Sequence, residues 1–102
     1  MKTHIKIYVN GKEEILPCRV TLGALLHFKE DTGKDISEIA KEDVLNLLKF
    51  VWYCVASACN ADGISFDISF DRFADCLSPE GLAEFYGGIG TEKKTSATAV
   101  TP

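Results

Sequence analysis

The stretch that decides the fold is residues 43–60, DVLNLLKFVWYCVASACN. Of the sixteen residues at positions 44–59, thirteen are apolar. The polar interruptions and one tyrosine fall at helical spacing along a single narrow stripe: Asn46, Lys49, Tyr53 and Ser57. The stretch is roughly twice as long as a typical buried strand, whereas a membrane span would need about 20 apolar residues. We therefore predict a central helix that is buried on nearly all sides.

The size of the chain limits how much of this helix can be covered. A chain of 102 residues, 46% hydrophobic and 25% charged, is typical of one globular domain. A domain this small buries only about 60 to 70% of the surface of its unfolded chain. We therefore expect apolar helix surface to remain and the protein to self-associate. The candidate contact residues on the central helix are Val51, Trp52 and Val55.

Charge and the first residues indicate the class of protein. The net charge is −4, and residues 60–86 carry six acidic residues but only one base, Arg72. A nucleic-acid-binding protein would be expected to show a basic patch or stripe, so we expect no nucleic-acid partner. The opening MKTHIKIYV has no long apolar core and no cleavage site, so we expect no signal peptide, no membrane anchor and a cytoplasmic protein.

The chain opens with an alternating segment that predicts a half-buried strand, and the Asn-Gly pair at residues 10–11 predicts a hairpin. A two-residue loop would pair Ile7 with Glu14, which places a core residue opposite a charged one. A three-residue loop would pair Ile5 with Ile15 and keep apolar residues together, so we favour the three-residue loop.

Local signals predict three further helices. Thr21 is a candidate N-cap for a helix over residues 22–32 that ends at Gly33. The apolar face of this helix comprises Leu22, Leu25 and Leu26. Residues 64–70 alternate like an extended segment that could lie along the sheet edge, and Ser69 then caps a helix starting near Phe70. Ser78-Pro79 begins the last helix and Gly87-Gly88 ends it.

These elements predict an α+β fold that is mainly α. An N-terminal β-hairpin packs on a small helical bundle around one long apolar helix. The globular domain is expected over residues 1–86. Residues 87–102 are small and polar without periodicity, so we expect them to form a flexible tail.

The sequence contains no recognised catalytic motif, so we expect no enzyme activity, no cofactor and no metal. Cysteines stand at positions 18, 54, 59 and 76 in segments that otherwise look like core. A zinc site is an alternative, but the spacing of its cysteines is not a recurring one: Cys54, Cys59, Cys76 and His27. The Gly63 region resembles part of a calcium loop but lacks the required carboxylates. An enzyme that uses the Cys76 thiol also remains open.

Three acidic residues spaced four apart form a candidate docking ridge for a basic partner: Asp67, Asp71 and Asp75. The alternative is an ordinary solvated face. To the extent that this segment is helical, the three carboxylates would share one side, where like charges repel by a few tenths of a kcal/mol per pair.

Four segments in this order resemble the small tail assembly chaperones of long-tailed bacteriophages and prophages. They are IKIYVNGKEEIL (5–16), LGALLHFKEDTGK (22–34), VLNLLKFVWYCVASAC (44–59) and SFDRFADCLSPEGLAEF (69–85). The resemblance implies a protein that coats the aggregation-prone tape-measure protein and helps recruit tail-tube subunits, without entering the finished virion. It also implies a second, frameshifted product, for which Lys93-Lys94 is the candidate slip position. A bacterial oligomeric adaptor unrelated to phage is the other hypothesis.

Overall fold

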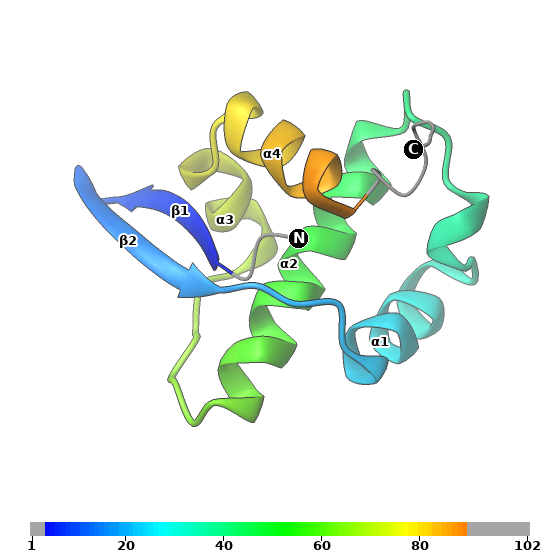
Figure 1. Ribbon diagram of the computed structural model, residues 1–102, viewed down its shortest axis with the longest axis horizontal. Helices are drawn as coiled ribbons and strands as arrows, with labels where there is room; N and C mark the ends of the chain where they lie inside the picture. Colours follow the sequence, from blue (N-terminus) through cyan, green and yellow to red (C-terminus); the bar gives the residue numbers. More distant parts are fainter. Residues whose placement is uncertain (1–3, 90–102) are drawn as a thin grey trace.

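The computed structural model describes residues 4–89, and its elements surround one long central helix, α2 (Figure 1). In chain order the elements are β1 (His4–Val9), β2 (Lys12–Pro17), α1 (Leu22–Thr32), a 3-10 turn η1 (Ile36–Glu38), α2 (Val44–Ala61), α3 (Phe70–Cys76) and α4 (Pro79–Ile89). The predicted α+β, mainly α class is confirmed. Residues 90–102, which include Lys93-Lys94 and most of the predicted tail, lie outside the described residues.

Helix α2 begins and ends where its sequence predicts. The Asp43 carboxylate accepts hydrogen bonds from the Asn46 backbone N–H at 3.2 Å and from its side-chain amide at 2.8 Å. At the other end Gly63 adopts φ 73°, and the Ile64 N–H reaches back to the Cys59 carbonyl at 2.8 Å. This is the Schellman arrangement, which satisfies carbonyls that a helix end leaves unpaired. Gly63 therefore serves helix termination.

The core forms around α2 because every other layer packs on it. Helix α2 contacts α1, α3, α4 and β2, while β1 contacts α3 and α4. In Figure 1 the hairpin and α1 lie on opposite sides of α2. The buried core comprises Ile5, Ile7, Cys18, Ala24, Phe28, Phe50, Val51, Cys54, Val55, Cys59, Phe73, Leu77 and Phe85. Five of these thirteen come from α2, which confirms it as the central buried helix.

The register of the hairpin differs from the prediction. The loop has two residues, Asn10 and Gly11, with φ of 54° and 78°, so Ile5 pairs with Leu16 and Ile7 with Glu14. The three-residue loop was wrong because β2 need not bury all of one face. Strand β2 is an edge strand, and the Glu14 side chain reaches water while Ile7 is fully buried.

Helices α3 and α4 start at the predicted caps. The Ser69 hydroxyl accepts from the Arg72 N–H at 3.3 Å, and the Ser78 hydroxyl accepts from the Gly81 N–H at 3.0 Å. The predicted stop at Gly87-Gly88 was wrong, because α4 continues to Ile89. A glycine costs about 1 kcal/mol of helix propensity, which weakens a helix without ending it.

The extended segment of residues 64–69 does not join the sheet, which has only two strands among residues 4–89. Instead it runs along α2. The Trp52 indole N–H donates to the Ile68 carbonyl at 2.9 Å, and the Trp52 ring meets Phe70 edge to face at 6.0 Å. Trp52 therefore holds the segment against α2. The segment does not pair with the edge of the sheet, where the sequence suggested that it could lie.

Candidate protein-interaction surface

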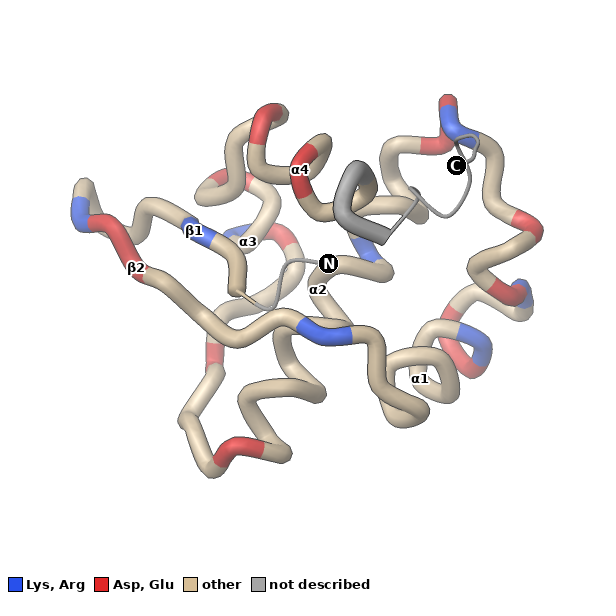
Figure 2. Tube along the Cα trace, viewed as in Figure 1, with Lys and Arg blue, Asp and Glu red and all other residues tan. Residues whose placement is uncertain are grey.

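The outer face of α1 presents three leucines to solvent. Leu22 is 84% exposed, Leu26 is 55% exposed and Leu25 is partly exposed. They stand at i, i+3 and i+4, so they form one continuous apolar strip, which we call the α1 leucine face. The first seven residues of α1 carry no charge, and this half of the helix is uniformly tan in Figure 2. An apolar strip of this kind on a helix is suited to binding another apolar surface.

The rotation of α1 explains why the leucines point outward. Ala24 and Phe28 occupy the opposite side and are buried, and the Phe28 ring packs edge to face on Phe50 at 5.4 Å. Gly23 lies so close to α2 that an added Cβ would stand 3.0 Å from the Ser57 hydroxyl. Small residues and one large ring therefore form the inner face of α1.

Polar contacts fix the same rotation. The Thr21 hydroxyl lies 2.5 Å from the Ser57 hydroxyl and also accepts from the Ala24 N–H at 3.0 Å, which caps α1 as predicted. Near the other end Asp31 accepts from the Tyr53 hydroxyl at 2.9 Å. Its carboxylate also lies 3.5 Å from the Lys49 ammonium. Three residues of the polar stripe of α2 therefore pair with α1 or its N-cap: Lys49, Tyr53 and Ser57.

This polar contact has a measurable electrostatic signature. Burial, together with the hydrogen bond to Asp31, raises the pKa of Tyr53 to about 12. The His27 ring stacks on Tyr53 with centroids 6.2 Å apart and lies 3.4 Å from the Glu30 carboxylate. His27 therefore takes part in the contact between α1 and α2.

The structure corrects the candidate contact residues of the central helix. Val51 and Val55 are fully buried, so neither side chain reaches a partner in this conformation. Trp52 is half-buried and its indole N–H is already paired with Ile68. On α2 itself the exposed apolar surface lies in the first turn, at Val44 and Leu45. The surplus surface expected of this small domain is therefore found mainly on α1.

The acidic residues lie on two different elements. Asp71 and Asp75 are exposed, one turn apart on α3, whereas Asp67 is exposed in the extended segment before that helix. A single helical ridge of all three is therefore absent. Figure 2 shows acidic residues on α3 and α4 and in the segment that leads into them. Among residues 4–89, none of the three aspartates forms an ion pair.

The cysteines behave as core residues. Burial raises the pKa of Cys18 to about 12 and also raises the pKa of Cys54 and Cys59, so these thiols stay protonated near neutral pH. Cys76 is partly exposed. Within the described part of the chain, no three potential ligands gather closely enough to hold a metal ion, and the alternative zinc set is not brought together.

One described helix, α2, has the length and the mean hydropathy, 1.3, of a membrane span. Core helices of water-soluble proteins share these properties. The inner residues of α2 pack against the rest of the chain, and six of them are buried: Phe50, Val51, Cys54, Val55, Ala58 and Cys59. These six residues make up 33% of the helix.

Comparison with known proteins gives no relative: the sequence matches no family model, and no curated protein or solved structure matches the chain. Function is therefore inferred from the surfaces described above and from the order of the elements. Among these surfaces the α1 leucine face is the most exposed apolar one.

Proposed function

We propose that this protein is a non-enzymatic tail assembly chaperone of a long-tailed phage or prophage. It binds the tape-measure protein in the host cytoplasm, keeps that long helical chain soluble and helps recruit tail-tube subunits to it. The observation that carries the proposal is the α1 leucine face, which supports binding of an apolar helical partner. The resemblance in element order supports the identity of that partner.

The leucine spacing suits a helix as the occupant. Side chains at i, i+3 and i+4 are the usual anchors when one helix packs on the apolar stripe of another. Fully burying a leucine contributes about 1.5 to 3 kcal/mol. Part of that gain is lost to the entropy cost of association, so a face of three leucines gives a modest, reversible affinity. Reversibility is needed by a chaperone that tail-tube subunits later displace.

The charge of the domain supports the same role. Residues 60–86 carry net −5, and this acidic surface lies on α3, α4 and the preceding segment, away from α1 (Figure 2). Like-charged surfaces keep coated particles apart and soluble. One side of the molecule is therefore suited to binding an apolar chain while the other faces water.

Co-expression tests the proposal. The long helical protein encoded beside this chain is produced with and without it, and the fraction remaining in the supernatant after centrifugation is measured. We expect a severalfold rise in soluble partner and recovery of the two proteins as one complex. An unchanged soluble fraction would contradict the proposal. Absence of any long helical protein among the neighbouring genes would favour an oligomeric adaptor unrelated to phage.

A further inference from the structure

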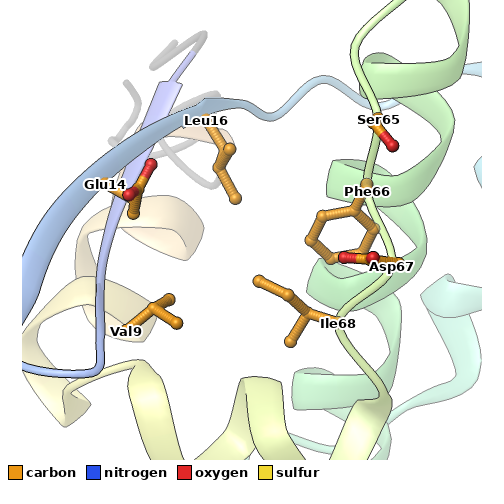
Figure 3. A pocket seen from close by; sticks show the side chains of 7 residues that line it. All are labelled: Val9, Glu14, Leu16, Ser65, Phe66, Asp67 and Ile68. Carbon is orange, nitrogen blue, oxygen red and sulfur yellow. The ribbon is translucent and has the colours of Figure 1, made fainter.

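A cleft of about 230 Å³ opens between the inner face of the hairpin and the extended segment of residues 64–69 (Figure 3). Its apolar lining comes from Val9 and Leu16 on the hairpin and from Phe66 and Ile68 on the segment. The volume lies below the range of about 300 to 1,000 Å³ typical of small-molecule sites. The cleft is therefore of a size for one or two side chains of an approaching polypeptide.

The extended wall of the cleft has unpaired backbone. The segment is held at its two ends, by the Ile64 N–H on the Cys59 carbonyl and by Trp52 on the Ile68 carbonyl. Between these points the backbone groups of residues 65–67 form no hydrogen bond with any part of the chain that the structure describes. Unpaired extended backbone of this kind can accept an additional strand through main-chain hydrogen bonds.

The charges at the cleft are all negative. Glu14 and Asp67 line opposite walls, both are exposed, and no lining residue is basic (Figure 3). Neither carboxylate forms an ion pair within residues 4–89. Lys12 lies on the same face of β2 as Glu14, nearer the turn, and leaves that carboxylate unpaired. The cleft therefore favours a ligand that brings its own cations.

We propose that this cleft binds an extended segment of a partner protein in which aliphatic side chains alternate with lysine or arginine. An aliphatic side chain enters the apolar trough, the flanking cations meet Glu14 and Asp67, and the partner's backbone pairs with residues 65–67. The inference goes beyond the proposed chaperone function, because it uses neither the α1 leucine face nor a helical partner. The two proposals are therefore tested independently.

A peptide titration tests the cleft on the full-length protein. The probe is an end-blocked six-residue peptide of alternating valine and lysine, and the readout is the amide NMR spectrum. The indole N–H of Trp52, the only tryptophan, is a resolved reporter because it is bonded to one wall of the cleft. We expect saturable shifts at Trp52 and residues 65–68 at up to millimolar peptide. The same peptide with glutamate in place of lysine should cause none.

Variants identify the groups responsible. Asp67→Asn and Glu14→Gln should each weaken binding by up to about fivefold, the scale of roughly 1 kcal/mol for one exposed ion pair. Asp75→Asn, an exposed aspartate outside the cleft, should leave binding unchanged. A peptide N-methylated at alternate residues should bind at least about tenfold more weakly, since it cannot donate along one edge. Equal binding of the glutamate peptide, shifts confined to α1, or no saturable shift would each overturn the proposal.

Discussion

At the scale of single residues, two small side chains and one ring decide which face of α1 meets water. Gly23 and Ala24 let the helix approach α2, and Phe28 fills the space against Phe50. The leucines have the more regular apolar spacing, yet they lie outside. Phe28 and the leucines lie on different sides of α1, so they cannot all face inward. Burial of the Phe28 ring against Phe50 is favoured over burial of the leucines.

This arrangement predicts a large loss of stability for one truncation on α1 and a small change for another. Phe28→Ala should lower the free energy of unfolding by about 3 to 5 kcal/mol, because it leaves a cavity beside Phe50. Leu26→Ala should change it by less than about 1 kcal/mol, since more than half of that residue is already exposed to water. Urea unfolding followed by circular dichroism measures both. A larger loss for Leu26→Ala would mean that α1 is rotated differently.

The ion pair of Arg19 and Asp62 predicts a pH dependence. The guanidinium donates to the carboxylate at 3.0 and 2.8 Å, and these hydrogen bonds hold the pKa of Asp62 below its ordinary value. A folded pKa below the unfolded one, about 3.9, stabilises the fold above that pH, and the contribution is lost as the pH falls through the folded value.

The melting temperature of wild type minus that of Asp62→Asn should therefore be larger at pH 7 than below about pH 4. Thermal unfolding across this range measures the difference. The control is Asp75→Asn, which removes an exposed carboxylate that has no ion-pair partner among residues 4–89. A difference that stays constant from pH 7 downward would show that the pair does not stabilise the fold.

At the scale of elements, a partly buried hydrogen bond joins α4 to α2. The Tyr86 hydroxyl donates to the Leu47 carbonyl at 2.6 Å, and burial raises the pKa of Tyr86 above its ordinary range. The Phe85 ring also meets the Phe50 ring of α2 edge to face, with centroids 6.5 Å apart. These contacts attach a helix that begins with Ser78-Pro79 and contains two late glycines.

Tyr86→Phe should cost about 0.5 to 1.5 kcal/mol, the usual scale for a single hydrogen bond, because the ring stays in place and only the hydroxyl is lost. In hydrogen exchange, the backbone amides of α4 should lose protection first, while the central amides of α2 keep theirs. Uniform loss of protection throughout the chain would contradict a local role.

The elements themselves could be predicted because their signals are local. The predicted caps at Thr21, Ser69 and Ser78 each depend on a few neighbouring residues, and each is present. The hairpin register and the inner face of α1 depend on contacts with residues that are distant in the sequence. Local alternation and spacing therefore did not identify them. For the same reason Val51 and Val55 were chosen as contact residues although α1, α3 and α4 cover α2.

At the scale of the whole molecule, exposed leucines lie on the first half of α1, and acidic residues lie on α3 and α4. We expect self-association through the α1 leucine face at tens of micromolar. Sedimentation velocity should show species larger than the 11.2 kDa chain, and Leu22→Ser/Leu26→Ser should restore the monomer. A wild-type protein that sediments as a strict monomer would count against surplus apolar surface as the driving force.

The most direct test of the central claim is the affinity of the long helical partner for three forms of the protein. The wild type is compared with Leu22→Ser/Leu26→Ser and with Leu45→Ser, a matched control because Leu45 is 58% exposed but lies on α2. If the α1 leucine face carries binding, Kd should rise about a hundredfold for the double variant, the loss expected for about 3 kcal/mol of leucine burial. It should change less than about threefold for the control. Equal affinity of the double variant and the wild type would contradict the claim.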